Sequence, residues 1–275
     1  MAASSNDLTL ALVQVASSTV PAENRDRLAS LPVGDAGLVV LPEYFQRDAG
    51  GPDEPLGTDA ETLEGPFVTA LVDRAGAQGG TWIAGMVERS DDPLRPFNTL
   101  VVVDGAGVRS AYRKLHLYDS FGFRESDRLM PGDATPAVLD IGGVRVGLMT
   151  CYDLRFPELA RGLSAAGVDL VVLPSAWVAG PRKVHHWRTL ASARAIENLV
   201  YVAAVGQPGP RYTGHTLLVD PRGDVLAEAG EADDVVTGTV SLGLVEEART
   251  ENPSLLNRRN DIAWTPVGVQ PGGGA

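Results

Sequence analysis

Cysteine is almost absent from this sequence, which holds Cys151 alone among its 275 residues. A single cysteine excludes an intramolecular disulfide framework and any metal site built from several cysteines. Basic residues are also scarce, because 23 Lys and Arg face 35 Asp and Glu, giving a formal net charge of −12. A nucleic-acid partner requires a basic surface, so we expect none. The acidic excess favours solubility instead.

Long hydrophobic runs are missing as well. The longest apolar runs, such as Leu170 to Leu173, are far shorter than the roughly 20 residues that cross a bilayer. The chain begins Met-Ala-Ala-Ser-Ser-Asn-Asp, which contains neither a basic segment nor an apolar one. We therefore expect no signal peptide, no membrane partner and a cytoplasmic protein.

Two kinds of cofactor motif are also absent. His185 and His186 are adjacent, and no His-Glu-x-x-His or similar spacing occurs, so the sequence predicts no metal site. No glycine-rich loop of the kind that holds phosphates is present, which argues against a bound nucleotide. We therefore expect a protein that works without a cofactor.

What the sequence does contain is an alternation of short β-branched runs and helical stretches. The predicted strands are Leu8–Val15, Gly37–Leu41, Thr81–Val87, Thr99–Asp104, Val108–Tyr112, Val144–Met149, Asp169–Leu173, Val200–Val205, Leu217–Asp220, Val225–Ala229 and Val236–Val240. The predicted helices are Asn24–Leu31, Ala60–Ala77, Pro157–Ala166 and His186–Leu199. Strand–helix–strand units favour parallel pairing, whereas the run from Thr81 to Val146 supplies consecutive strands. This mixture indicates an α/β fold with mixed sheets and helices on their outer faces.

The sequence predicts one domain over residues 1–266, because no internal repeat or long Pro/Gly/Ser linker divides it. Residues 267–275 are rich in glycine and are predicted to form a disordered tail. Tyr118–Pro131 is a long connection with little periodicity, and connections of this length are often functional.

Cys151 lies where an α/β fold places its chemistry. It follows the strand Val144–Met149 and precedes Pro157, where a helix is expected to begin. Ligands and catalytic groups gather at the carboxyl ends of strands, and a nearby helix N-terminus would favour a thiolate. The alternative interpretation is a small buried hydrophobic residue, which is the usual role of a lone cysteine.

Three polar residues change that balance. Glu43 follows the apolar run Leu38 to Leu41 and could act as a general base. Lys114 also follows strand-like sequence, and an ammonium beside a thiol lowers the thiol pKa and can stabilise an oxyanion. Glu125 lies in the long connection and could position the lysine or a substrate amide. Taken alone, Glu43 and Lys114 are better explained as surface side chains, and Glu125 is a weak candidate.

Together these segments resemble the three signature segments of the carbon–nitrogen hydrolase (nitrilase) superfamily. They read Leu-Pro-Glu43, Arg-Lys114-Leu-His-Leu and Thr-Cys151-Tyr-Asp-Leu-Arg-Phe-Pro-Glu, in the order and spacing of that family. The resemblance extends from roughly Leu8 to Ile262 and includes Leu-Pro-Ser-Ala-Trp177. It implies a single carbon–nitrogen hydrolase domain over 1–266, folded as a four-layer α-β-β-α sandwich of two mixed sheets.

The resemblance also implies a role for each residue of these segments. Cys151 is then the nucleophile, Glu43 the general base, and Lys114 the group that stabilises the tetrahedral intermediate. Glu125 orients the lysine and the substrate, and the backbone N–H of Tyr152 shares the oxyanion hole with Lys114. These roles describe hydrolysis of a small linear amide to acid and ammonia through a thioester.

The residues after the cysteine narrow the reaction. True nitrilases usually carry Cys-Trp-Glu, whereas this chain has Cys151-Tyr152-Asp153, which disfavours nitriles. The stretch looks most like the branch of deaminated glutathione amidases and omega-amidases, which act on deaminated glutathione or on ω-amides of 2-oxo acids. Such substrates carry a carboxylate, for which Arg155 is the candidate cation. A structural ion pair of Arg155 with Glu158 or Asp153 is an equally good explanation.

Trp177 and His186 are further candidates for the substrate-binding wall. His186 and its neighbours are expected at a helix N-terminus facing the pocket, although capping and packing explain them equally well. The resemblance implies a homodimer or a higher homo-oligomer. Alternative functions are an N-carbamoyl amine or amino acid hydrolase, an aliphatic amide hydrolase, and a catalytically silent binding protein with the same fold.

Overall fold

Two six-stranded sheets lie face to face at the centre of the molecule. The computed structural model describes residues 7–51 and 54–259. The first sheet holds, in spatial order, β14 (Asp234–Val240), β1 (Leu8–Gln14), β2 (Leu38–Val40), β3 (Thr81–Glu88), β4 (Phe97–Asp104) and β5 (Gly107–Arg113). The second holds β13 (Val225–Glu228), β12 (Leu217–Val219), β11 (Tyr201–Gly206), β10 (Leu170–Ser175), β9 (Val144–Leu148) and β8 (Val138–Ile141).

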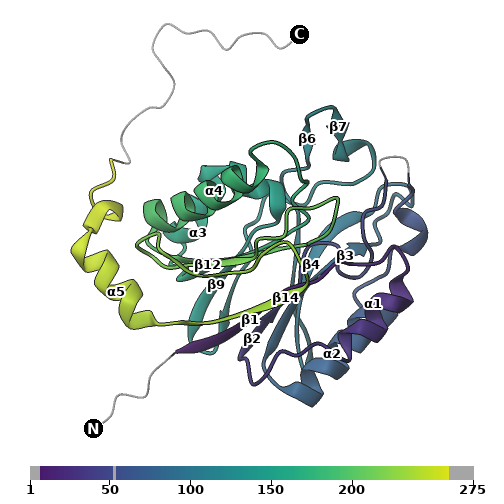
Figure 1. The fold of residues 1–275 in the computed structure, drawn as a ribbon, viewed down its shortest axis with the longest axis horizontal. Helices are drawn as coiled ribbons and strands as arrows, with labels where there is room; N and C mark the ends of the chain where they lie inside the picture. Colours follow the sequence, from purple (N-terminus) through teal and green to yellow (C-terminus); the bar gives the residue numbers. More distant parts are fainter. Residues whose placement is uncertain (1–6, 52–53, 260–275) are drawn as a thin grey trace, which may run out of the picture.

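Helices cover the outer face of each sheet. Figure 1 shows α1 (Pro21–Leu28) and α2 (Pro66–Gln78) on one side of the paired sheets. On the other side lie α3 (Pro157–Ala165) and α4 (Lys183–Asn198). This arrangement confirms the predicted α-β-β-α sandwich. A further helix, α5 (Leu242–Glu251), buries Val245 and packs against the core between the sheets.

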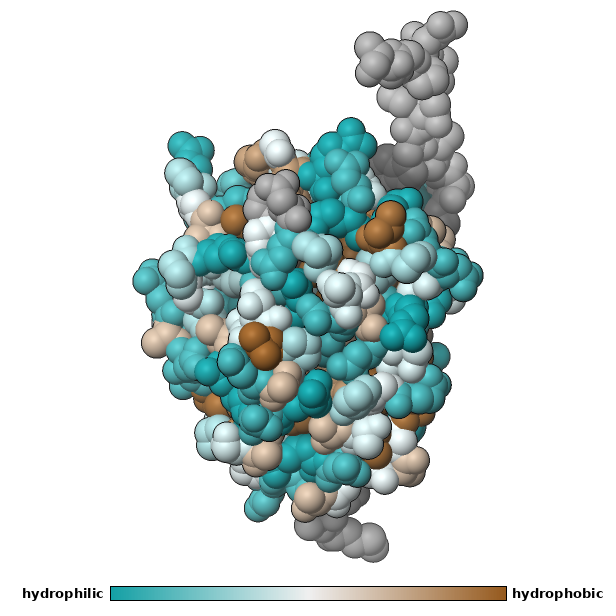
Figure 2. All heavy atoms as spheres, turned by 90° about the vertical axis from the view of Figure 1, so that its right-hand side faces the viewer, coloured by the Kyte–Doolittle hydropathy of each residue, from teal (hydrophilic) through white to brown (hydrophobic). Residues whose placement is uncertain are grey.

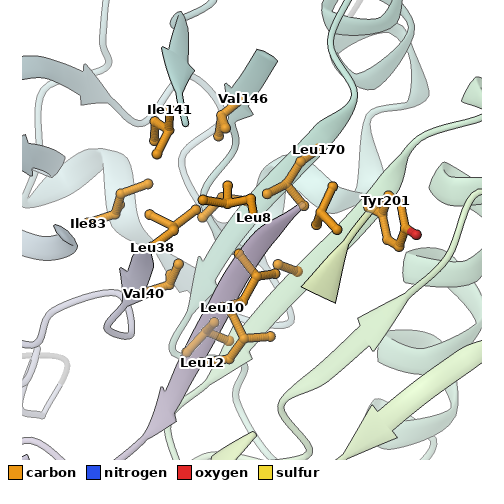
Figure 3. Packing of buried hydrophobic residues seen from close by; sticks show 14 of the residues in the cluster. Leu8, Leu10, Leu12, Leu38, Val40, Ile83, Ile141, Val146, Leu170 and Tyr201 are labelled. Atoms are coloured by element: carbon orange, nitrogen blue, oxygen red, sulfur yellow. The ribbon is translucent and has the colours of Figure 1, made fainter. Parts of the chain in front are cut away.

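The residues of each central strand face two different hydrophobic cores. Side chains alternate along a strand, so Leu8, Leu10 and Leu12 of β1 point between the sheets while Ala11 and Val13 point toward the helices. Figure 3 shows the three leucines packed against side chains of the second sheet. Burial on both faces explains why these strands read as nearly continuous apolar runs in the sequence.

Strand direction decides which loops meet. In the first sheet β2 and β3 are parallel, and β4 runs antiparallel to both β3 and β5, so β5 runs in the same direction as β2. Glu43 follows β2 and Lys114 follows β5, so both residues lie at the same end of the sheet, where these strands finish. In the second sheet β9 and β10 are parallel, so Cys151 and Ala176 also emerge together.

Three predicted helices begin at a different residue in the structure: the one predicted from His186 begins at Lys183, and the other two begin at a proline. The helix predicted over Ala60–Ala77 begins at Pro66, and the one predicted over Asn24–Leu31 spans Pro21–Leu28. Proline has no N–H to lose in the first turn of a helix. Before α2, the Glu61 carboxylate accepts a hydrogen bond from the Phe67 N–H at 2.7 Å and so fixes the helix start. Both β8 and α5 were absent from the prediction.

Some predictions concern residues outside the described ranges. These are the glycine-rich tail, 267–275, and the last part of the predicted domain, 260–266. Among the helices of residues 7–51 and 54–259, none has the length and apolar character that a membrane crossing requires. On the face shown in Figure 2, hydrophobic residues are scattered among polar ones.

Candidate active site

Cys151 stands on a sharp turn between β9 and α3. It is the first residue of a short 3₁₀ helix, η3 (Cys151–Arg155), and its φ is +46°, in the left-handed region that few residues other than glycine adopt. The side chain is 7% exposed and lines a cavity of about 680 Å³. Unusual backbone conformations of this kind are found where a fold must aim a functional group.

Asp153 holds this turn in place. It is fully buried, and its Oδ2 accepts hydrogen bonds from the Thr150 N–H at 2.8 Å and the Tyr112 hydroxyl at 2.7 Å. Its Oδ1 accepts from the His116 N–H at 3.1 Å and contacts His116 Nδ1 at 2.7 Å. Sequence reasoning gave Asp153 no role of this kind, although an Asp three residues after Thr150 is a capping-box spacing that could have shown it.

Replacing Asp153 by Asn should destabilise the protein. An amide NH₂ would take the place of one carboxylate oxygen and would face the two groups that this oxygen now binds as an acceptor. We expect the free energy of unfolding to fall by about 3 kcal/mol in urea titrations followed by circular dichroism. Tyr112→Phe is the matched control, since it removes one donor and should cost roughly 1 kcal/mol. Equal losses in the two variants would show that Asp153 is no anchor.

Lys114 lies buried between two carboxylates. It follows β5 directly, is 2% exposed, and donates its backbone N–H to the Asn98 carbonyl at 2.8 Å. Its Nζ lies 3.0 Å from Glu43 Oε1 and 2.9 Å from Glu125 Oε2. Burial alone would lower the pKa of this ammonium, but Glu125 and Glu43 outweigh it and raise the pKa well above its ordinary value. Lys114 is therefore a fixed cation at neutral pH.

The Glu43 carboxylate is held by groups from several distant segments. Its Oε1 accepts a hydrogen bond from Asn98 Nδ2 at 2.7 Å, and its Oε2 accepts one from the Ala176 N–H at 2.6 Å. The Gln207 side chain donates to the Glu43 carbonyl at 2.7 Å. Sequence reasoning missed Asn98 and Gln207, because isolated amide residues in a strand or loop give no motif.

Glu125 belongs to the long connection that the sequence singled out. The connection forms a small hairpin, β6 (Asp119–Ser120) with β7 (Phe123–Arg124), followed by the 3₁₀ turn η2 (Glu125–Asp127). Beside its contact with Lys114, the Glu125 carboxylate accepts hydrogen bonds from the Tyr44 hydroxyl and the Tyr118 N–H, both at 2.7 Å. The Glu125 carboxylate is thus fixed from two sides.

The electrostatic environment of Cys151 reverses one expectation. The sequence favoured a thiolate, with the lysine lowering the thiol pKa. In the structure, burial raises the pKa of the Cys151 thiol well above its ordinary value, and Glu43 raises it further through its charge and a hydrogen bond. Lys114 opposes this shift and is outweighed. The Cys151 side chain at rest is therefore a neutral thiol, which would have to lose its proton to a base before it could act as a nucleophile.

This raised pKa has a measurable consequence for alkylation by iodoacetamide. A raised pKa keeps the thiol protonated at neutral pH, so the rate should still be rising above about pH 8.5, the ordinary cysteine pKa. Glu43→Gln removes a charge that raises the thiol pKa, so the inflection should move to lower pH. Mass spectrometry of the alkylated protein gives the rates. A plateau already reached at neutral pH in the unaltered protein would contradict the neutral thiol.

The cavity brings the four main candidates together. Its wall includes Glu43, Lys114, Glu125 and Cys151. A volume of about 680 Å³ lies within the range of small-molecule sites. Apolar and aromatic residues form much of the remaining wall, namely Tyr44, Ala49, Leu56, Tyr118, Phe121, Phe123, Ala176, Trp177, Val178, Ala179, Pro181 and Tyr212.

The other predicted site residues are placed differently. Trp177 lines the cavity and is 3% exposed. Tyr152, Arg155 and His186 are not among the lining residues. The Tyr152 N–H lies in the first turn of η3, where a helix leaves its N–H groups without internal acceptors. His186 Nδ1 is buried without a hydrogen-bond partner in the described part of the chain, and burial and Arg155 lower the pKa of this imidazole.

Arg155 lies behind the cavity wall. Its guanidinium stacks over the Trp177 ring at 4.9 Å from the ring centre. Its Nε and Nη2 are buried without hydrogen-bond partners among the described residues. The expected structural ion pair is not formed there, since the Asp153 carboxylate is taken up by Tyr112 and His116, and Glu158 makes no ion pair with Arg155.

Comparison with known proteins gives the following matches. The family model of the carbon-nitrogen hydrolases matches residues 9–250. The chain is 37% identical to a deaminated glutathione amidase of Escherichia coli O157:H7, over 92% of this chain and 97% of that protein. It is 35% identical to a 2-oxoglutaramate amidase of Paenarthrobacter nicotinovorans, over 98% and 95% of the two chains. The crystal structure of a CN-hydrolase superfamily protein from Xanthomonas campestris superposes with a TM-score of 0.83 at 31% identity, covering 94% of this chain and 99% of that one.

Proposed function

The chain belongs to the carbon–nitrogen hydrolase family, as its signature segments predicted, and we propose that it hydrolyses the ω-amide of a 2-oxo acid or deaminated glutathione. It is an amidase, acting on carbon–nitrogen bonds other than peptide bonds. The proposal assigns the nucleophile to Cys151, the general base to Glu43 and the oxyanion contact to Lys114.

One observation carries the assignment of the residues. A buried ammonium, Lys114, is shared at 3.0 Å and 2.9 Å between the carboxylates of Glu43 and Glu125, in a cavity wall that also holds the Cys151 thiol. Two carboxylates and one ammonium leave this cluster with one excess negative charge. Moving the Cys151 proton onto Glu43 neutralises that carboxylate and leaves Lys114 paired with Glu125 alone. The ammonium can then donate to a new anion.

Acylation follows from this proton movement. As the Cys151 sulfur attacks the amide carbonyl carbon, its proton passes to Glu43 and the carbonyl π electrons move onto oxygen. Lys114 Nζ and the Tyr152 N–H donate to the oxyanion. One such donor lowers the activation free energy by roughly 3 kcal/mol. When the tetrahedral intermediate collapses, the carbon–nitrogen bond breaks and Glu43 returns the proton to the departing amine. A thioester on Cys151 remains.

Deacylation uses the same groups in reverse. Water takes the place of the amine, gives a proton to Glu43, and attacks the thioester carbonyl. The carbon–sulfur bond then breaks and the sulfur recovers its proton from Glu43. Glu125 takes no proton in either half-reaction. Its hydrogen bonds from Tyr44 and Tyr118 fix its carboxylate beside Lys114, which holds the ammonium in place.

The substrate class is supported by the relatives. They are named for 2-oxoglutaramate and for deaminated glutathione, two compounds that carry the same 2-oxoglutaryl acyl group on different amines. Cleavage of that acyl–nitrogen bond would release ammonia from the first and the dipeptide cysteinylglycine from the second. The predicted release of ammonia therefore applies to the primary amides. A cavity of about 680 Å³ has room for the larger substrate as well.

A panel of amides tests this proposal. It contains deaminated glutathione, 2-oxoglutaramate, 2-oxosuccinamate, simple aliphatic amides, an N-carbamoyl amino acid and a nitrile, with acid and amine products both quantified. We expect turnover of the 2-oxo acid amides, with a Cys151→Ala preparation as the control for contaminating amidases. Carbon dioxide released with ammonia would favour the carbamoyl alternative, and silence across the panel from folded protein would exclude the proposed substrates.

The location and the oligomeric state of the protein stay predictions. We propose that it is cytoplasmic, from its sequence composition, and that it forms a homodimer or higher homo-oligomer, as members of this family usually do. Light scattering of the purified protein measures its assembly, and fractionation of the source cells measures its location.

A further inference from the structure

Lys183 is a cation on the cavity wall that the mechanism does not use. It is the first residue of α4, is 9% exposed, and lines the cavity together with Cys151. Aromatic rings surround its ammonium, with Nζ 4.1 Å from the centre of Phe121, 5.3 Å from Tyr118 and 5.6 Å from Trp177. These faces stabilise a positive charge while removing it from water.

Lys183 differs from the other cations of the cavity wall outside the catalytic cluster. Arg211 pairs with Asp48 at 2.8 Å, and Arg128 donates to backbone carbonyls, including that of Ala49 at 3.0 Å. In the described part of the chain, Lys183 Nζ makes one hydrogen bond, to the neutral hydroxyl of Tyr118 at 3.1 Å, and no ion pair. An ammonium has three donors, so this cation retains capacity for a bound anion.

The surroundings of Lys183 add to this capacity. Burial lowers the pKa of its ammonium, and the charge of Arg155 behind Trp177 lowers it further. Lys183 in the cavity wall and Arg155 outside it therefore repel each other, and neither has a carboxylate partner among the described residues. An anionic group that entered here would relieve the repulsion between them and satisfy the unused donors.

We propose that Lys183, with the Tyr118 hydroxyl, binds the carboxylate at the far end of the acyl group and so makes the enzyme selective for anionic amides. The inference rests on the proposed function and names the residue that recognises its substrate class. It also moves the expected carboxylate contact from Arg155 to Lys183. Arg155 lies outside the cavity wall and acts on the site through its charge and its stacking on Trp177.

Tyr118 connects this contact to the reacting groups. Its hydroxyl accepts from Lys183 at 3.1 Å, while its backbone N–H donates to Glu125 Oε2 at 2.7 Å. Glu125 in turn lies 2.9 Å from Lys114 Nζ. A carboxylate bound to Lys183 and Tyr118 is thereby placed at a fixed position relative to the oxyanion contact. Binding energy from the unreactive end of the substrate can then position the carbonyl for attack.

The test compares an anionic and a neutral amide of similar length, 2-oxoglutaramate and its methyl ester, on Lys183→Met and on the unaltered enzyme. Methionine keeps a long flexible side chain among the aromatic rings and removes the charge. We expect kcat/KM to fall about 100-fold for the anionic amide, mostly through KM, and to change less than about threefold for the neutral one. Lys183→Arg should recover part of the loss, and Arg155→Met is the matched control.

Three results would overturn the inference: an equal loss for both amides, no loss for either, or a larger selective loss in Arg155→Met. Failure of the proposed function has a different signature, since the unaltered enzyme would then turn over neither amide. In that case, calorimetric titration of the unaltered protein and of Lys183→Met with 2-oxoglutarate tests the carboxylate contact directly. Binding that is lost in the variant supports the carboxylate contact, and equal binding or none in the unaltered protein refutes it.

Discussion

Cys151→Ala should reduce amide turnover by about 10⁵-fold or more, because the two-step route through a thioester requires a nucleophile at this position. The oxyanion contacts and the bound substrate remain, so a small residual rate above the uncatalysed reaction is expected. The fold should survive, since the change removes one buried sulfur from a side chain that is 7% exposed. Thermal unfolding of the variant checks this point alongside initial rates.

The thioester provides an independent measurement of the same prediction. Rapid acid quenching of the unaltered enzyme during turnover, followed by mass spectrometry, should show a mass increase equal to the acyl group on the peptide that contains Cys151. Cys151→Ala should show none. Cys151→Ser is the close control, since a hydroxyl is a much weaker nucleophile than sulfur in this setting. Turnover by the Ala variant at more than about a hundredth of the original rate would rule out a cysteine nucleophile.

Lys114→Met should lower both activity and stability. The variant loses the proposed oxyanion donor and leaves Glu43 and Glu125 buried without their counterion, at 1% and 5% exposure. We expect kcat/KM to fall by roughly 10³-fold. We expect the free energy of unfolding to fall by about 4 kcal/mol, because a charge left alone in the interior is strongly destabilising. Steady-state kinetics and urea unfolding measure the two effects.

A double variant separates these two contributions. Lys114→Met with Glu125→Gln removes one of the stranded carboxylates, so a large part of the lost stability should return. Activity should stay low, because the ammonium proposed to stabilise the oxyanion is still missing. If the double variant unfolds as easily as the single one, the buried charge is not the cause of the destabilisation. If its activity recovers, Lys114 is not the oxyanion contact.

The sequence was enough to predict the layers of the fold and the segments of the candidate site. Strands such as β2 and β10 are buried on both faces, so nearly all their residues are apolar and are visible as short runs. Glu43 follows β2 and Cys151 follows the mostly buried β9, each within three residues, and a chemically reactive residue in that position is conspicuous. Both β8 and α5 escaped prediction, because partly exposed elements give weaker hydrophobic patterns.

By itself, therefore, the sequence determined the family, the α-β-β-α order of the layers and the local position of each signature residue. Only the tertiary structure decided which groups those residues meet. The Glu43 carboxylate is held by the Ala176 N–H, 133 residues away along the chain, and Lys183 meets Tyr118 across 65 residues. The direction of the Cys151 pKa shift was decided in the same way. Burial and the pairing of charges depend on the packing of distant segments, which no local pattern of residues records.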